Sequence, residues 1–457
     1  MEATSYKGTN KLIVGIVFGV ITYWLFAQSM VNVVPAVQQD LGISLSILNV
    51  GISMTALFSG IFIAVTGGLA DKIGRVKMTY LGFILSIVGS LLLIICQGTF
   101  LLIVARIIQG LSAACIMPAT LALMKTYFEG ADRQRALSYW SIGSWGGSGI
   151  CSFAGGGIAT YLGWRWIFVF SIVIALIGMV LIKGTPESKV ARSETETSFD
   201  YGGLVTFIVS MVALNLVITR GGQFGWTSLT TLILAGIFLL FVSLFFYIEN
   251  RKANGFIDFS LFKEKKYLGA TLSNFLLNAV AGTLAVGSMY VQEGRGLTSF
   301  QAGLLSLGYL ACVLITIRIG EKLLQKMGAK KPMVIGSILA AVGVIMMSLT
   351  FVEGMTFHVV YFLGFALLGT GLGVYATPST DTAISSAPLD KVGMASGVYK
   401  MASSLGGSFG VAISVAVYAI VKNTSGIETA GMVGLLTNVF FCLVSLVAIV
   451  VVVPNHE

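Results

Sequence analysis

The chain has 457 residues, of which 56% are hydrophobic and only 10% are charged, and its mean hydropathy is +0.92. Soluble domains carry about 25% charged residues, so this composition excludes a water-soluble globular protein. The 55 glycines and 29 phenylalanines are instead typical of closely packed membrane helices. The five cysteines form no C-x-x-C pair and there are two histidines, so neither a disulfide framework nor a zinc site is indicated.

Apolar runs recur along the whole chain, and each is long enough to cross a bilayer, which takes about 20 apolar residues. The predicted spans lie near residues 12–34, 46–70, 78–96, 100–124, 136–160, 164–183, 201–219, 228–248, 267–291, 300–318, 333–352, 355–380, 393–421 and 428–453. The first run is itself long enough to span, so we expect no cleavable signal peptide. With 14 spans, both termini are expected on the same side of the membrane.

The basic residues test this count, because Lys and Arg concentrate in cytoplasmic loops. The loops on the side of the N-terminus hold 21 of the 28 Lys and Arg residues. The opposite loops hold only Arg165, Arg220, Arg295 and Lys422. We therefore predict cytoplasmic termini, and we expect the net charge of +9 to lie against anionic lipid rather than nucleic acid.

A short repeat relates two of the cytoplasmic loops. Leu69, Lys72, Gly74 and Lys77 recur 254 residues later as Leu323, Lys326, Gly328 and Lys331. The offset equals eight spans, which favours two six-helix halves with an inserted pair, although so few positions could also match by chance. We expect an N-terminal bundle (1–183), a cytoplasmic linker (184–200), an inserted pair facing lipid (201–250) and a C-terminal bundle (251–457). Transporters built from such repeats bind substrate near the midplane between the halves.

The loop between the second and third spans carries the strongest motif. It reads GGLADKIGRVK over residues 67–77, with Gly67, Gly68, Asp71, Gly74 and Arg75 as candidate gating residues. Glycines allow two helix ends to approach closely, and a carboxylate there can contact a helix N-terminus or an arginine. Such contacts can form in one conformational state and break in another. The alternative is an ordinary basic cytoplasmic loop.

This loop resembles the loop 2–3 signature of the major facilitator superfamily, and LIVARIIQG (102–110) resembles its span-4 motif. With 14 spans, the chain is similar to the drug/proton antiporter branch and to Nor-type quinolone and multidrug efflux pumps of Gram-positive bacteria. The segments YATPSTD (375–381), GMASG (393–397) and LGGSFG (405–410) strengthen that resemblance. It implies an all-α integral membrane protein of the major facilitator fold, with two six-helix bundles and two inserted helices, and a role for Arg106 in proton coupling. The alternative role for Arg106 is a structural hydrogen bond to a neighbouring helix.

Two spans depart from the pattern of this branch. In the fifth span, Cys151 and Ser152 stand where a glycine–proline pair is expected, so the glycine-rich face remains but the proline kink is lost. In the first span, Ala27 occupies a position that is often acidic. Proton-coupled transport needs a group that titrates in the pathway. The remaining candidates are Asp381, Glu293 and Asp40, each of which could instead be a surface or capping carboxylate.

Polar residues inside other spans are candidates for a substrate cavity, because they are costly against lipid. Trp24, Gln28 and Asn32 are expected to form one helical stripe at i, i+4 and i+8 in the first span. Asn274 and Asn278 lie four residues apart in the ninth span, and Tyr399 and Lys400 lie in the thirteenth. Hydrogen bonding between helices is the alternative for each set.

These features predict a proton-driven exporter of amphipathic drugs (quinolones, cationic dyes and biocides) that works by alternating access. Such a protein would be a cell-membrane, antibiotic-resistance antiporter, monomeric, without a cofactor, a metal or a nucleic-acid partner. The alternatives are an importer, a uniporter or a metal-ion/proton exchanger of the same fold. A membrane enzyme is disfavoured because His358 and His456 are expected on opposite faces, and no nucleotide-binding G-x-x-x-x-G-K-[ST] motif is present.

Overall fold

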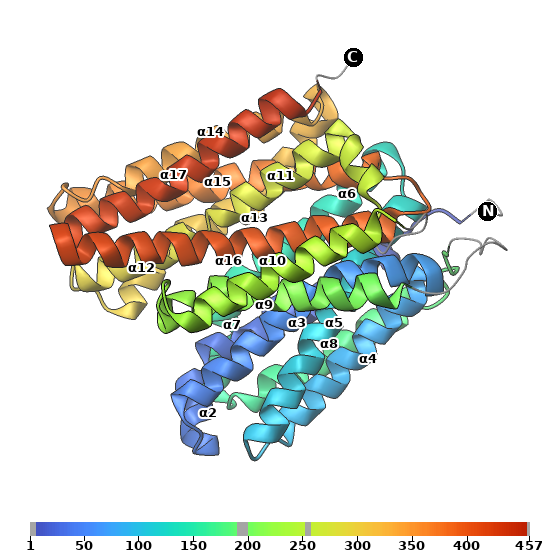
Figure 1. Cartoon of the computed structure of the whole chain (residues 1–457), viewed down its shortest axis with the longest axis horizontal. Helices are drawn as coiled ribbons and strands as arrows, with labels where there is room; N and C mark the ends of the chain where they lie inside the picture. Colours follow the sequence, from blue (N-terminus) through green and yellow to red (C-terminus); the bar gives the residue numbers. More distant parts are fainter. Residues whose placement is uncertain (1–5, 190–199, 252–256, 455–457) are drawn as a thin grey trace. The chain divides into compact units, whose positions relative to one another are not determined.

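The computed structural model describes residues 6–189, 200–251 and 257–454, and these are helical almost throughout (Figure 1). The side chains of a few residues within these ranges, Asn32 and Cys151 among them, lie outside the description. The first half contains α1 (Asn10–Ile21), η1 (Thr22–Ala27), η2 (Gln28–Asn32), α2 (Val34–Leu41), α3 (Leu45–Ile73), α4 (Arg75–Ile94), α5 (Thr99–Tyr127), α6 (Gly130–Ser141), η3 (Ile142–Gly146), α7 (Gly147–Tyr161) and α8 (Arg165–Ile182).

The later helices are α9 (Tyr201–Phe224), α10 (Leu229–Glu249), η4 (Phe259–Lys263), α11 (Lys265–Ala279), α12 (Gly282–Glu293), α13 (Ser299–Met327), α14 (Lys330–Met347), α15 (Gly354–Ser386), α16 (Val392–Ser425) and α17 (Ile427–Val452). No strand occurs in the part of the chain that is described. The prediction of an all-α membrane protein is therefore confirmed.

Thirteen helical segments of the described residues are long and apolar enough to cross a membrane. They match the predicted spans except the fifth, where α6, η3 and α7 form one continuous helical run that includes residues without described side chains. The ninth span is two helices, because the chain makes 3₁₀-type hydrogen bonds at Val280 and Ala281 between α11 and α12.

The first and fifth spans are irregular helices, which corrects the simple α-helical expectation for the first. Its second half is a π-helix (η1) followed by a 3₁₀-helix (η2), so the i, i+4, i+8 stripe of Trp24, Gln28 and Asn32 does not apply. The fifth span contains a second π-helix, η3. Because η1 and η3 contact each other, two irregular turns lie side by side.

The chain divides into two compact units, which we describe separately. Unit 1 comprises the described residues of Met1–Leu204, Glu249–Asp258 and Ala387–Met401. In it, α5 packs against α3 and α4, and α8 packs against α1 and α4. Small residues allow these contacts: a Cβ on Gly110 of α5 would lie 2.6 Å from the backbone oxygen of Thr55 in α3.

Unit 2 comprises Val205–Ile248, the described residues of Phe259–Ser386, and those of Ala402–Glu457. Its packing repeats that of unit 1, since α15 packs against α13 and α14, and α17 packs against α11 and α14. Close approach recurs as well, because a Cβ on Gly343 would lie 2.6 Å from the backbone oxygen of Gly364. The pairs in unit 2 lie eight predicted spans after those in unit 1, as the sequence repeat predicts.

The ends of the repeated helices agree to the residue. Both α3 and α13 are 29 residues long, and each ends at a glycine with positive φ, Gly74 at +128° and Gly328 at +76°. Only glycine adopts such angles without strain, which explains why these two repeat positions are glycine. The predicted four-part division of the chain remains a prediction, because the two units group the segments differently.

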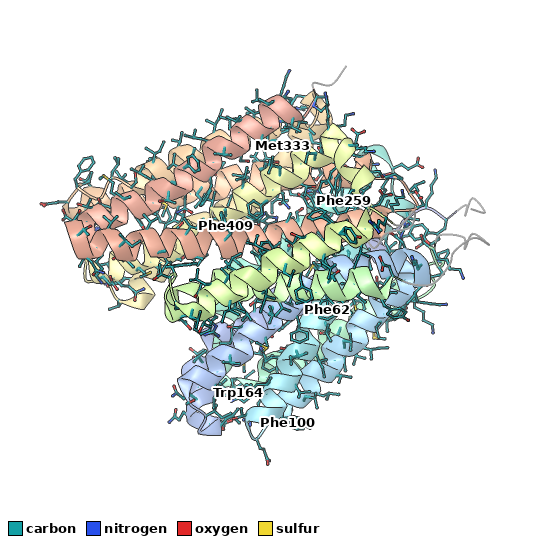
Figure 2. All side chains as sticks on the ribbon, viewed as in Figure 1. Phe62, Phe100, Trp164, Phe259, Met333 and Phe409 are labelled. Atoms are coloured by element: carbon teal, nitrogen blue, oxygen red, sulfur yellow. The ribbon has the colours of Figure 1, made fainter. Side chains whose placement is uncertain are left out.

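Large apolar side chains cover much of the outer surface of the helices. Phe100, labelled in Figure 2, is 80% exposed, and Leu232, Leu239 and Leu240 of α10 are all more than half exposed. In water such a surface would cause aggregation, whereas in a membrane it is the surface that lipid covers.

Candidate functional site

Asp71 lies at the centre of a hydrogen-bonded cluster in unit 1. Its carboxylate accepts hydrogen bonds from Arg75, whose Nε is 3.0 Å and Nη2 2.8 Å from Oδ1. It also accepts from the backbone N–H groups of Gly393 and Met394, both at 2.9 Å. These two N–H groups belong to the first turn of α16, so the carboxylate caps that helix where its dipole favours a negative charge.

Arg75 extends the cluster to the segment that precedes α16. Its Nη2 donates to the backbone oxygen of Leu389 at 2.6 Å, and Lys125 donates to the backbone oxygen of Ala387. Nη1 donates to Thr126 at 2.7 Å. We call Asp71, Arg75, Lys125 and residues 387–394 the latch. It contains both contacts expected for the motif, a helix N-terminus and an arginine.

Glycines bring the latch together. A Cβ on Gly67 would lie within 3.1 Å of backbone atoms of Gly393 and Gly397, so α3 and α16 touch through their backbones. Gly68 is less crowded, because a Cβ added there would lie 4.0 Å from the Met394 side chain. A residue larger than glycine at position 67 would push the two helices apart.

One residue next to the latch escaped the sequence analysis. Glu187, in the linker after α8, accepts hydrogen bonds from the backbone N–H groups of Val76 and Lys77, both at 3.0 Å, and so caps α4. A single acidic residue in a polar linker carries no spacing signal that would reveal this contact. The repeat offers no second latch, because Gln325 and Ala329 occupy the positions 254 residues after Asp71 and Arg75.

Arg106 is fully buried within unit 1. Its Nη1 donates to the backbone oxygen of Ala27 at 2.8 Å and to Gln109 Oε1 at 2.6 Å. Its Nε and Nη2 have no hydrogen-bond partner. Beside it, Gln28 donates to the Tyr23 hydroxyl at 3.0 Å. The structural hydrogen bond to backbone, the alternative role for Arg106, is thus present, and half of the guanidinium remains available.

The glycine-rich face of the fifth span packs tightly on the first span. A Cβ on Gly147 would lie 2.9 Å from the Trp24 side chain, and one on Gly155 would lie 2.8 Å from Ser29. The expected close packing without a proline is therefore observed. Trp24 Nε1 is buried without a hydrogen-bond partner.

The candidate cavity residues are divided between the two units. In unit 2, Asn278 donates to Asn274, which itself donates to Ser403 at 2.6 Å. In unit 1, Tyr399 is buried, and the Lys400 ammonium lies 5.0 Å from the ring centre of Trp140. Interhelical hydrogen bonding, the alternative for the asparagines, is thus observed for Asn274. The side chain of Asn32 lies outside the described residues.

The three candidate carboxylates have different surroundings. Asp381 is buried in α15. Glu293 is exposed and accepts hydrogen bonds from Lys422 at 2.7 Å and Tyr418 at 2.9 Å. Asp40 lies outside the spans, where a hydrogen bond from Arg165 lowers its pKa below the ordinary value for aspartate. Asp40 is thus held in its charged form at neutral pH.

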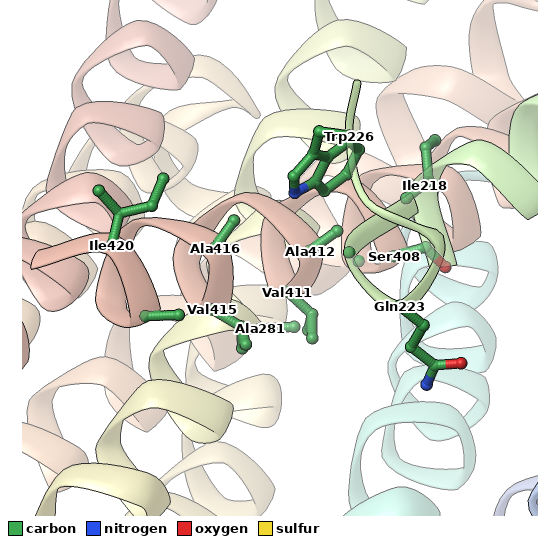
Figure 3. Close-up of a pocket in the computed structure, with 13 residues that line it drawn as sticks. Ile218, Gln223, Trp226, Ala281, Ser408, Val411, Ala412, Val415, Ala416 and Ile420 are labelled. Carbon is green, nitrogen blue, oxygen red and sulfur yellow. The ribbon is translucent and has the colours of Figure 1, made fainter. Parts of the chain in front are cut away.

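Unit 2 contains a cavity of about 800 Å³ that no sequence pattern indicated (Figure 3). One wall is the small-residue face of α16, with Ala412, Ala416 and Ala419. The end of α9 and the following turn add Gln223 and Trp226. The end of α9, in the segment expected to face lipid, therefore also lines a largely apolar cavity of a size that suits a drug-like molecule.

Comparisons with known proteins agree with this architecture. Residues 16–411 match the family described as the Major Facilitator Superfamily. The chain is 56% identical to the quinolone resistance protein NorB of Staphylococcus aureus strains MRSA252 and COL, over 99% of this chain and 98% of each relative.

Two solved structures share the fold at low sequence identity. The human organic anion transporter MFSD10 has a TM-score of 0.63 at 13% identity, covering 96% of this chain and 98% of that one. The proton:xylose symporter XylE has a TM-score of 0.66 at 15% identity, covering 95% and 94%. The match to the family across most of the chain, with these helices and this packing, shows that the protein is a multi-pass membrane transporter of the Major Facilitator Superfamily.

Proposed function

We propose that the protein exports quinolones and other amphipathic drugs in exchange for protons. The observation that carries this proposal is the 56% identity to the quinolone resistance protein NorB along almost the entire length of both chains. Cationic dyes and biocides are further expected substrates. The transporter works as a monomer in the cell membrane, with both termini in the cytoplasm and without a cofactor.

The latch serves as a conformational gate in this proposal. Its bonds join the end of α3 and the start of α4 to the start of α16 and the segment before it, and each is made by charged groups or helix-end N–H groups. Hydrogen bonds to charged groups are strong but strictly geometric, so a small displacement of α16 breaks several of them together. Closing and opening the latch therefore exposes the binding site to one side of the membrane at a time.

Proton coupling is assigned to Asp381 and Arg106. Asp381 is preferred because its carboxylate is buried within a span, whereas Asp40 and Glu293 are exposed at the surface. An external proton occupies the carboxylate, the drug leaves, and deprotonation towards the cytoplasm resets the transporter. Each charge that moves across 100 mV contributes about 2.3 kcal/mol, enough for a drug gradient of tenfold or more.

The substrate contacts are assigned to Trp24, Gln28, Asn32, Tyr399 and Lys400 in unit 1 and to Asn274 and Asn278 in unit 2. The apolar cavity against α16 supplies a surface for the uncharged part of an amphipathic molecule. Small residues and one indole can accommodate different ring systems without specific hydrogen bonds, as broad specificity requires.

Transport into proteoliposomes with imposed pH gradients tests the proposal. We expect accumulation of norfloxacin or ethidium when the gradient is directed to drive exchange, and none when the gradient is collapsed with nigericin. Uptake that ignores the gradient would favour a uniporter, and uptake together with protons would favour an importer.

A further inference from the structure

Two nitrogens of the Arg106 guanidinium are buried in unit 1 without a hydrogen-bond partner. Nε and Nη2 lie on one edge of the planar guanidinium, and neither has a hydrogen-bond partner although the side chain is fully buried. The other edge is occupied, since Nη1 donates to both Ala27 and Gln109. Two parallel N–H groups on one free edge match the two oxygens of a carboxylate.

The side chains that surround Arg106 supply no counter-charge. In the described structure its guanidinium donates hydrogen bonds to two neutral groups, the Gln109 side chain and the backbone carbonyl of Ala27. None of the hydrogen bonds that the Arg106 guanidinium donates goes to an acidic side chain.

The acidic side chains of unit 1 with known partners are engaged elsewhere. Asp71 binds Arg75 and α16, Asp40 binds Arg165, and Glu187 caps α4. A second buried cation of unit 1, Lys400, differs from Arg106 because the Trp140 ring lies against its ammonium group. Among the described residues of unit 1, Arg106 is therefore a buried cation that neither an acidic side chain nor an aromatic ring compensates.

An uncompensated guanidinium within a membrane span is energetically costly, and an anion that enters the site recovers part of that cost. We propose that Arg106 binds the carboxylate of the transported molecule through its Nε–Nη2 edge, so that zwitterionic and anionic carboxylic acids are preferred over their esters. This inference rests on the proposed drug-export function. It adds that the transporter prefers substrates with a carboxylate.

Competition binding to the full-length protein in nanodiscs tests this preference without any proton gradient. Radiolabelled norfloxacin is displaced by norfloxacin or by its ethyl ester, which differ only in the carboxylate. A charged hydrogen-bonding pair is worth about 10–100-fold in affinity, so we expect the acid to bind that much more tightly than the ester.

Three variants separate charge from geometry. Arg106→Gln removes both donors, and we expect it to bring the ratio of acid to ester affinity to within about twofold of one. Gln109→Glu leaves the arginine in place but supplies a carboxylate where Gln109 Oε1 lies, 2.6 Å from Nη1, and should lower the ratio in the same direction. Arg165→Gln removes a guanidinium that Asp40 already binds, so it controls for a general loss of positive charge.

Equal affinities for acid and ester in the wild type, or a ratio that survives both Arg106→Gln and Gln109→Glu, would overturn the proposal. If Arg106→Gln fails to fold, Gln109→Glu alone decides. A titration of the protein with chloride alone tests whether Arg106 instead binds an inorganic anion. If chloride stabilises the wild type but not Arg106→Gln, and the acid binds no more tightly than the ester, the proposal is overturned. Failure of proton-driven export in proteoliposomes would leave the binding ratio unaffected and so refute only the proposed function.

Discussion

Asp71→Asn tests the latch by removing one negative charge with almost no change in volume. The carboxylate accepts four hydrogen bonds, two from Arg75 and two from the first turn of α16. An asparagine retains one acceptor oxygen, and its NH₂ group must face one of the donors. At least one N–H group of α16 therefore loses its acceptor, and Arg75 loses its counter-charge.

The energetic cost follows from these contacts. Removing one partner of a buried ion pair costs about 3–5 kcal/mol, and one lost charged hydrogen bond accounts for about 1.5–3 kcal/mol of that. A net loss of about 3 kcal/mol would shift the latch towards its open form by about 100-fold. We expect drug export to fall strongly at unchanged expression, because the gate no longer closes.

Cysteine alkylation measures this shift directly. Ser396 of α16 is fully buried, so a Ser396→Cys reporter in a background without the five native cysteines should react slowly with a water-soluble maleimide. Asp71→Asn should accelerate alkylation by one to two orders of magnitude. Lys77→Gln, a charge change at an exposed position of the same loop, is the matched control. An alkylation rate unaffected by Asp71→Asn would refute the latch.

The described contacts support three further predictions. Asp40→Asn should lower stability by at most about 1 kcal/mol at pH 7, because the Asp40–Arg165 pair is exposed. Since the pKa of Asp40 is lowered in the folded state, this contribution is present above about pH 4 and vanishes as the pH falls further, so melting temperatures of wild type and variant should converge in acid. Ala412→Trp should fill part of the 800 Å³ cavity and raise KM more for bulky drugs than for small ones in vesicle transport; equal effects on all would contradict a binding role. Gly110→Ala should destabilise the protein by about 1–3 kcal/mol in thermal unfolding, whereas Gly157→Ala, where a Cβ meets nothing within 4 Å, should not.

Much of the fold could be predicted because it follows from simple physical patterns. The lengths of the apolar runs predict the membrane spans, and the distribution of Lys and Arg predicts which loops share a side of the membrane. Glycine at repeat positions 74 and 328 marks the ends of two equivalent helices. The contacts of Asp71 with an arginine and a helix N-terminus were also predictable, because a carboxylate at a helix end has few other partners.

Other features could not be predicted because they depend on distant packing. The π-helical turns of η1 and η3 have no marker in composition, and the stripe of Trp24 and Gln28 fails for that reason. The cap that Glu187 provides joins residues 110 or more positions apart. The cavity lined by Trp226 depends on the small residues of α16 meeting the end of α9, which no local pattern reveals.

The irregular turn in the first span has a consequence for the guanidinium that it contacts. Ala27 is the last residue of η1, and its carbonyl is one of only two acceptors that Arg106 has in the described structure. Any rearrangement of that turn to a regular α-helix changes where this carbonyl points and so alters the free energy of the arginine. Thermodynamic linkage requires the converse as well: a group that neutralises Arg106 must also shift the equilibrium between the irregular and the regular helical conformation of the first span. The backbone conformation of that span is therefore coupled to anion binding.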